Sequence, residues 1–200
     1  QQFSEGVDVT TAQVAAALRK FTPVSTSRPS PQAFLDAYEA AASAGADAVV
    51  SVHISSDMSG TVESAALAAS QSPIPVEVVD SRSMGMAMGY AVLSAAMAAR
   101  EGLDAKAVAA VARSRAGAAT VIFYVDTLEY LRRGGRIGVA SALLGSALAI
   151  KPLLALSDGH IAAIERGRQS VRGFSRPQVV APHGPDAGGG PGGRAGGRLG

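Results

Sequence analysis

The sequence predicts an α/β fold, a mainly parallel sheet flanked by helices, followed by an incomplete α+β second domain. The first observation is that β-rich segments alternate with helical segments along residues 48–125. The second is that this alternation ends near residue 126, where short apolar segments joined by turn residues begin. The third is a composition of 48% hydrophobic and 17% charged residues, which over 200 residues is enough for a sizeable core.

Two helix-start signals stand in the N-terminal part of the chain. The Thr-x-x-Gln pattern at residues 10–13 has the spacing of a capping box and predicts a short helix to about residue 20. Ser30-Pro31 is typical of an N-cap followed by the first helical position, and helical apolar spacing follows it. Between these helices, an extended stretch at Val24 is expected to lead into Ser25-Thr26-Ser27.

Strands and helices then alternate. The predicted strands are rich in β-branched residues and cover residues 48–54, 76–79 and 120–125. The predicted helices between them are rich in alanine and cover residues 61–70, 86–100 and 104–116. In such a parallel sheet the carboxyl ends of the strands are expected to meet at one edge, which is where ligands bind.

The pattern changes after residue 125. A short helix at 128–133 and an apolar helix near 140–147 are expected before two hairpin strands, 152–156 and 160–165, joined by Asp158-Gly159. Nine of the 23 glycines and four of the ten prolines lie between residues 177 and 200. We therefore expect an α/β domain over 1–125, the start of a second domain over 126–172, and a disordered tail over 173–200.

Composition excludes several classes of function. The formal net charge is +2, so electrostatics do not favour nucleic acid as a partner. The chain has no cysteine, which excludes disulfides, thiolate nucleophiles and cysteine-based metal sites. No apolar run reaches the roughly 18 residues of a membrane span, and no signal peptide is visible. We expect a cytoplasmic protein that holds neither a metal nor a cofactor.

Three predicted strands end in turns rich in hydroxyl groups. The hydroxyl residues of these turns are Ser25-Thr26-Ser27, Ser55 and Ser56 with Ser59, and Ser81 with Ser83. Two of the turns run into helix N-termini, whose free N–H groups favour an anion. One interpretation is that the hydroxyls only cap helices. The other is that they converge on a shared site for a carboxylate or a phosphate.

The sequence contains little catalytic equipment. It lacks the glycine-rich loop that binds ATP, the His-Glu-x-x-His zinc motif and the Gly-x-Ser-x-Gly nucleophile elbow. The histidines His53, His160 and His183 are far apart, and His53 alternates with apolar residues, which favours a structural role. An anion site without a base or a nucleophile indicates binding and not turnover.

Two residue clusters have two interpretations each. Met58, Met84, Met86 and Met88 fit either an adaptable apolar pocket or ordinary core packing. Arginines flank the pair Gly134-Gly135 on both sides. One interpretation is that these arginines lie at a solvated helix end, where cations are favoured by the helix dipole. The other is that they contact an anion or form part of a docking surface.

Five motifs along residues 3–172 resemble the DegV family of bacterial proteins. They follow the order and spacing of that family, and they are Thr26-Ser27-Arg28-Pro29-Ser30-Pro31, Ser55-Ser56-Asp57-Met58-Ser59-Gly60-Thr61, Val79-Asp80-Ser81 with Ser83-Met84-Gly85, Asp126-Thr127-Leu128-Glu129-Tyr130-Leu131-Arg132-Arg133-Gly134-Gly135-Arg136-Ile137, and Ala149-Ile150-Lys151-Pro152-Leu153. Compared with the family pattern, a first strand is missing before Gln1. A Gly/Pro/Arg tail also replaces the rest of the second domain.

The resemblance implies a protein that is not itself an enzyme. It implies that a long-chain fatty acid is held by its carboxylate between two domains and presented to a separate ATP-binding fatty acid kinase subunit, with transient lipid exchange at membranes. The implied lipid-binding residues are Thr26, Ser27, Ser55, Ser56, Ser59, Gly60 and Ser81. Among them, the carboxylate-binding hydroxyls correspond to Thr26 or Ser27 and to Ser55 or Ser56. Arg132 and Arg133 are implied to contact the partner or an anion. The alternative is a small-molecule kinase or transferase that binds phosphate.

Overall fold

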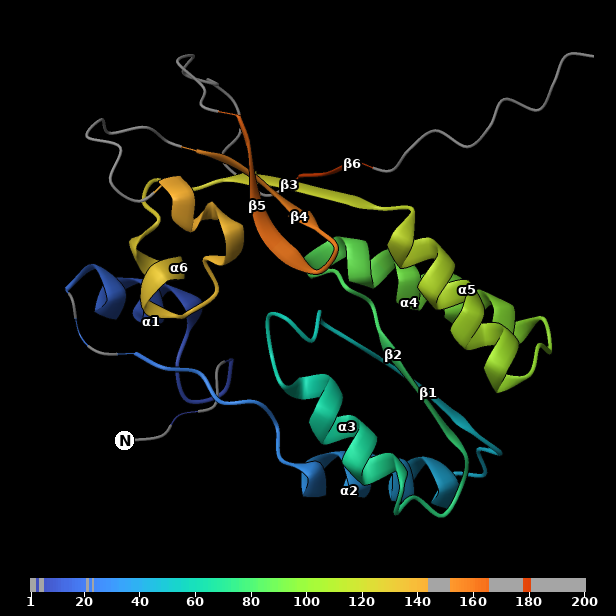
Figure 1. Ribbon diagram of the computed structural model, residues 1–200. Helices are drawn as coiled ribbons and strands as arrows, with labels where there is room; N and C mark the ends of the chain where they lie inside the picture. The colour runs from blue at the N-terminus through green and yellow to red at the C-terminus, as the bar shows by residue number, and fades with distance from the viewer. Residues whose placement is uncertain are drawn as a thin grey trace, which may run out of the picture.

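A computed structural model of the 200-residue chain describes residues 3, 6–20, 22, 24–143, 152–165 and 178–180 (Figure 1). Its helices are α1 (Thr11–Arg19), α2 (Pro31–Ser43), α3 (Thr61–Ala69), α4 (Gly85–Arg100), α5 (Ala105–Gly117), α6 (Glu129–Arg133) and the 3₁₀ helix η1 (Gly138–Leu143). Its strands are β1 (Val49–His53), β2 (Val76–Asp80), β3 (Thr120–Tyr124), β4 (Leu153–Ser157), β5 (His160–Glu165) and β6 (Gln178–Val180).

The helix starts follow their predicted caps. Thr10 accepts a hydrogen bond from the Gln13 backbone, and the Gln13 side chain accepts one in return, so the capping box is confirmed. Ser30 caps α2 by accepting from Ala33 N at 3.2 Å, and Pro31 is the first helical residue. No strand forms at Val24, which lies in irregular chain, so the expected strand before the first hydroxyl turn is wrong.

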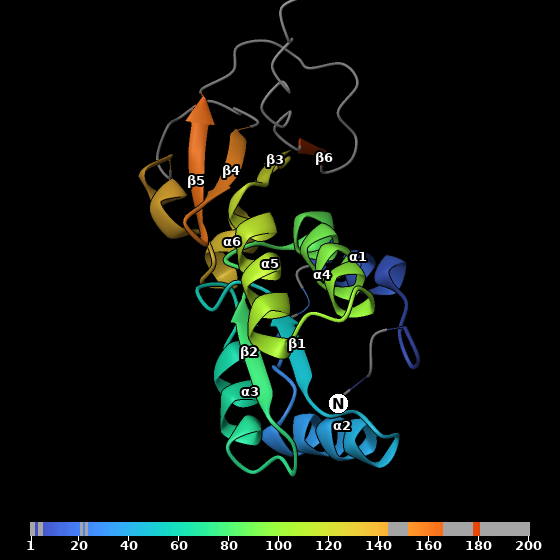
Figure 2. The ribbon, with the colours of Figure 1, turned by 90° about the vertical axis from the view of Figure 1, so that its right-hand side faces the viewer.

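A parallel pair, β1 and β2, forms the first sheet, with Val49 opposite Val76 and His53 opposite Asp80. Helices α2 and α3 lie on one side of this pair, and α4 and α5 lie on the other (Figures 1 and 2). Val79 of β2 is fully buried against the α4–α5 side. The predicted α/β arrangement of a parallel sheet between helices is therefore confirmed.

Helices α4 and α5 meet through alanines. The buried residues of α4 are Ala87, Ala91, Ala95 and Ala98, and those of α5 are Val108, Ala109, Ala112 and Ala116. Most of the large apolar side chains of α4 are exposed, and they include Met86, Tyr90, Leu93 and Met97. Small side chains on both helices let the two backbones approach closely, so this interface depends on shape more than on buried area.

The second sheet is antiparallel and has the order β5-β4-β3-β6. Its hairpin turns at Asp158-Gly159, as predicted, with φ values of +48° and +82° that suit a two-residue turn. Leu154 and Ile161 are buried in its core, together with Val121 of β3 and Ala87 of α4. Because Ala87 reaches this core while Ala95 and Ala98 belong to the first, α4 joins the two sheets.

Two segments differ from expectation. β3 was predicted beside the parallel strands, but it pairs antiparallel with β4 and β6. The apolar run of β3 can pack beside parallel or antiparallel strands, so hydrophobic periodicity does not predict which kind of partner it has. β6 lies inside the segment expected to be disordered; its two valines give it strand propensity, and it pairs with β3. The rest of 173–200, and residues 144–147 of the expected apolar helix, lie outside the described residues. The boundary after residue 125 stays a prediction.

Candidate functional site

The carboxyl ends of β1 and β2 meet at one edge of the parallel pair, as the sequence predicts. Two loops leave this edge, residues 54–60 after β1 and residues 81–84 after β2. They are hydrogen-bonded to each other, because Ser55 N donates to Ser83 O at 2.9 Å. Ser81 N donates back to His53 O at 3.1 Å. The two loops therefore form one connected structure at the sheet edge.

A cavity of about 530 Å³ lies beside these loops. Its lining comes from three separate parts of the chain, and the lining residues are Thr26, Ser27, Arg28, Ile54, Met58, Ser59, Gly60 and Arg136. The volume lies in the range of about 300–1,000 Å³ that is usual for small-ligand sites. Hydroxyls and two guanidinium groups line it together with the apolar side chains of Ile54 and Met58. Such a lining suits an anionic head group with an apolar body.

Contacts with neighbouring groups orient the two guanidinium groups. Arg28 Nη1 donates to Glu63 Oε2 at 3.2 Å, and both side chains are largely exposed. The Arg28 side chain lies directly against Gly60, where a Cβ atom would collide with its guanidinium. A side chain at residue 60 would therefore displace the Arg28 guanidinium, which is the far end of a flexible, half-exposed side chain. Arg136 Nε donates to Met58 O at 3.0 Å and so ties the loop after β1 to the chain that follows α6.

Four of the seven predicted lipid-binding residues line this cavity, namely Thr26, Ser27, Ser59 and Gly60. The other three are not among its lining residues and are hydrogen-bonded to protein groups. Ser55 is fully buried and donates to Gly159 O at 2.9 Å. Ser56 Oγ donates to Asp80 Oδ2 at 2.6 Å, and Ser81 Oγ donates to Ser83 O at 3.2 Å. These three hydroxyls support the loops that form the site.

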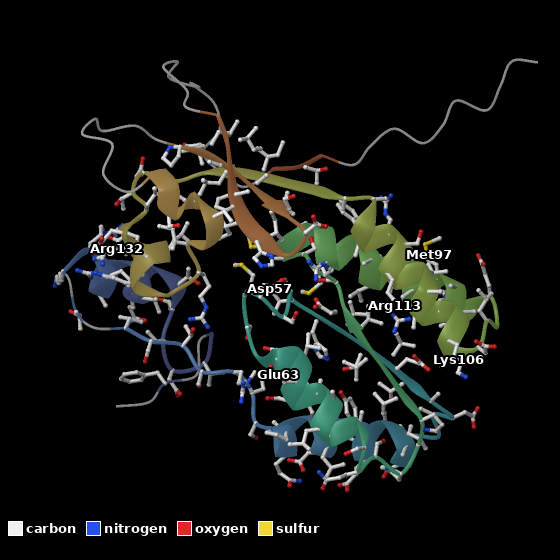
Figure 3. All side chains as sticks on the ribbon, viewed as in Figure 1. Asp57, Glu63, Met97, Lys106, Arg113 and Arg132 are labelled. Atoms are coloured by element: carbon white, nitrogen blue, oxygen red, sulfur yellow. The ribbon has the colours of Figure 1, made fainter. Side chains whose placement is uncertain are left out.

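Arg132 and Arg133 lie on α6 and are not among the residues that line the cavity. Both pair with Glu129, Arg132 Nη2 and Arg133 Nε each lying 2.8 Å from Glu129 Oε1. Hydrogen bonds from Arg132 and Arg133 lower the pKa of Glu129 to about 2. The pKa of Arg132 is raised by the same Glu129 hydrogen bond. Figure 3 shows Arg132 on α6, in the part of the molecule that also holds α1.

Arg28 was not singled out as a site residue from the sequence, whereas Arg136 was among the arginines around Gly134-Gly135 for which a contact with an anion was left open. The available signal for Arg28 was its position beside Thr26 and Ser27. For Arg136 it was the glycine before it, because Gly135 has a φ of +71° and reverses the chain after α6. The methionines do not all follow one interpretation, and Met84 packs against the second core. Met58 lines the cavity and also packs against the second core, whereas Met86 is exposed.

His53 lies in a separate cluster under α2. Its Nε2 is 2.7 Å from Ser51 Oγ, which also accepts a hydrogen bond from Tyr38 OH at 2.9 Å. The Phe34 ring meets the imidazole edge-on at 5.1 Å between centroids. Burial lowers the pKa of His53, and the charge of Asp80 partly opposes this. These contacts give His53 a structural role, as the sequence favours.

The described part of the chain also bears on other classes of site. Among the described residues, no group of three or more His, Cys, Asp or Glu side chains is placed to hold a metal ion. In the same residues, no helix is both long enough and apolar enough to cross a membrane.

Comparison with known proteins assigns the family. The family model described as "Uncharacterised protein, DegV family" matches residues 1–176. The chain belongs to the DegV family. It is 46% identical to a DegV domain-containing protein of Streptomyces coelicolor, over 88% of this chain and 63% of that protein. It is 42% identical to one of Deinococcus radiodurans, over 84% of this chain and 60% of that protein. This DegV chain thus spans less than two thirds of the length of either relative.

Solved DegV structures share the fold. A DegV family protein from Thermus thermophilus, described for its fatty acid binding, superposes with a TM-score of 0.75 at 40% identity, covering 82% of this chain and 59% of that one. DegV of Bacillus subtilis, described as a fatty acid binding protein, superposes with a TM-score of 0.72 at 29% identity, covering 84% and 61%. These similarities confirm the α/β fold and the family that the sequence predicts, and the incomplete second domain stays a prediction.

Proposed function

We propose that this chain binds a long-chain fatty acid through its carboxylate and does not itself catalyse a reaction. The observation that carries the proposal is the cavity in which Thr26, Ser27 and Ser59 share one lining with Arg28 and Arg136. Hydroxyl donors and guanidinium groups suit a carboxylate, and the adjoining Ile54 and Met58 suit the start of an alkyl chain. The fatty acid binding of the Thermus thermophilus and Bacillus subtilis relatives supports the same ligand class.

The alkyl chain supplies most of the affinity in this proposal. Each buried methylene contributes about 0.8 kcal/mol, so a dozen contribute roughly 10 kcal/mol as an upper bound. Each hydrogen bond to a charged head group contributes about 1.5–3 kcal/mol. We therefore expect palmitate to bind much more tightly than hexanoate, with the hydroxyls fixing the orientation of the ligand. Equal affinity for the two acids would contradict the proposal.

The head-group site is tested by the double variant Thr26→Ala/Ser27→Ala. Loss of one or two hydrogen bonds to the carboxylate is expected to weaken palmitate binding at least about tenfold, because 1.4 kcal/mol corresponds to a factor of ten. Binding of methyl palmitate, which lacks the charge, is expected to change little. Ser114→Ala, at an exposed position of α5, is the matched control. If acid and ester lose affinity alike, the substitutions have damaged packing and the site assignment fails.

The proposal extends to a partner and a compartment. In it, the cytoplasmic protein exchanges fatty acid with membranes and presents the carboxylate to a separate ATP-dependent kinase subunit, which Arg132 and Arg133 contact from α6. Arg133→Ala is then expected to leave palmitate binding intact and to slow acyl phosphate formation when that subunit and ATP are supplied. An unchanged rate would remove Arg133 from the partner surface.

Calorimetry with ATP tests the rival phosphate-binding function, for which tight ATP binding by the isolated chain is the expected result.

A further inference from the structure

The two guanidinium groups that line the cavity are held by different kinds of partner. Arg136 donates to two backbone carbonyls, Met58 O through Nε at 3.0 Å and Gly134 O through Nη1, and it has no carboxylate partner among the described residues. Arg28 Nη1 instead donates to a carboxylate oxygen, Glu63 Oε2, at 3.2 Å. Two guanidinium groups and one carboxylate leave one net positive charge at the cavity.

Glu63 lies in the first turn of α3, where Figure 3 labels it, and is not among the residues that line the cavity. The Glu63 side chain is 76% exposed and the Arg28 side chain is 54% exposed. Ion pairs as exposed as this one are weak, because water and salt screen the charges. Arg28 can therefore turn from Glu63 to an anionic ligand at little cost.

The two residues before Arg28 add hydrogen-bond donors to the same wall of the cavity. In the part of the chain that the structure describes, the hydroxyls of Thr26 and Ser27 form no hydrogen bond with another protein group. In this they differ from Ser56, whose hydroxyl donates to Asp80. Two hydroxyl donors beside a guanidinium group suit the oxygens of an anionic head group.

Two other carboxylates lie near the same loops and have partners of their own. Asp57 Oδ2 lies 4.0 Å from Arg82 Nη2 and 3.2 Å from His160 Nδ1. The Asp80 carboxylate accepts hydrogen bonds from Ser56 Oγ at 2.6 Å and from Arg82 N at 2.8 Å. Neither carboxylate is paired with a cation that lines the cavity. Among these described carboxylates, Glu63 is the one that competes with a ligand for a lining guanidinium group.

We propose that Glu63 is a specificity-determining residue, which together with Arg28 restricts the cavity to head groups with a single negative charge. This inference rests on the proposed function and names the charge class of its ligand. A monoanion such as a carboxylate balances the one net positive charge. A dianion such as a phosphate monoester leaves excess negative charge, and Glu63 repels it about twice as strongly, because the Coulomb energy is proportional to the charge. The pair therefore favours a fatty acid over an alkyl phosphate.

The test compares three ligands with the same alkyl chain, namely palmitate, hexadecyl phosphate and methyl palmitate, by calorimetry at pH 8. At this pH a phosphate monoester carries about two negative charges. Wild type is expected to bind palmitate more tightly than hexadecyl phosphate. Glu63→Gln removes the charge and keeps the shape of the side chain. It is expected to raise the affinity for palmitate up to about fivefold and for hexadecyl phosphate up to about 25-fold, with no change for the ester.

Glu77→Gln is the matched control, because Glu77 is also paired with an arginine, Arg113 at 3.8 Å, and is not among the residues that line the cavity. This variant makes the same change in net charge and is expected to keep the wild-type ratio of the two anion affinities. Arg28→Gln is expected to weaken binding of both anions and not of the ester. Equal gains for the two anions in Glu63→Gln, or a preference of wild type for hexadecyl phosphate, would overturn the proposal.

Failure of the proposed function would be seen separately. If none of the three long-chain ligands binds wild type, the fatty acid proposal fails, and acetate and inorganic phosphate then test the charge preference at pH 8. Their binding is followed through the amide NMR signals of residues 26–28 and 59–61. Tighter binding of acetate by wild type, reversed in Glu63→Gln, would support the role of Glu63. No response to either anion, or no reversal in the variant, would overturn it.

Discussion

The substitution Gly159→Ala tests how tightly the hairpin turn fits the sheet edge. Gly159 has a φ of +82°, and placing a non-glycine residue there costs about 1–2 kcal/mol. The added Cβ would also stand 2.6 Å from Ser55 Oγ and 2.7 Å from Asp57 Oδ2, so these groups must separate. Loss of the Ser55 hydrogen bond costs about 1 kcal/mol more. We expect the free energy of unfolding to fall by about 2–3 kcal/mol in total.

The assay is urea denaturation, and the matched control is Gly102→Ala. Gly102 has a similar φ of +85°, but a Cβ there would meet no atom within 4 Å. It should therefore lose only the conformational part, about 1–2 kcal/mol. The difference between the two variants isolates the contact with Ser55 and Asp57. Equal losses would refute the reasoning, because they would mean that the turn moves aside without cost. A large fall in the m-value would indicate a change in the unfolded or native ensemble instead.

Two further predictions concern titration. The Glu129 carboxyl should titrate near pH 2, because hydrogen bonds from Arg132 and Arg133 hold its pKa there. Its contribution to stability is present above the unfolded pKa of 4.5 and is lost as pH falls toward 2. Carbon-detected NMR of Arg132→Gln should show the midpoint move back toward 4.5, and an unmoved midpoint would contradict the assignment. Burial lowers the pKa of His53 below 6.5, so its neutral form favours folding and stability should fall as pH drops below that value. Thermal unfolding at pH 7.5 and 5.5 should show a smaller loss for His53→Gln than for wild type, and equal losses would argue against a buried neutral imidazole.

Local chemistry made much of the fold predictable. The helix caps at Thr10 and Ser30 and the Asp158-Gly159 turn depend on residues close in sequence, and the structure confirms all three. The pairing of β3 was not predictable in the same way. Its neighbours, β4 and β6, are brought to it by tertiary packing, and an apolar strand fits a parallel or an antiparallel partner equally well.

The same distinction between local and distant partners applies to the residues of the candidate site. Thr26, Ser27, Ser59 and Gly60 follow short motifs, and the structure brings them to one cavity. The roles of Ser55, Ser56 and Ser81 depend on partners that are distant or on another loop. Ser55 bonds to a hairpin more than a hundred positions away in the chain, and Ser56 bonds to the end of the next strand. Hydroxyl residues at a strand end therefore indicate where a site lies, but they do not show which hydroxyls face the ligand.

The alanine interface between α4 and α5 has a consequence for side-chain entropy. Alanine has no rotamers to lose, so packing Ala91, Ala95 and Ala112 against their neighbours costs almost no side-chain conformational freedom. The long side chains of α4, such as Met86 and Met97, remain at the surface, where they keep most of their rotamers. The helix pair thus orders its backbones at a low entropic cost. It gains its cohesion from dispersion contacts between closely spaced backbones and methyl groups, which any larger side chain at these positions would force apart.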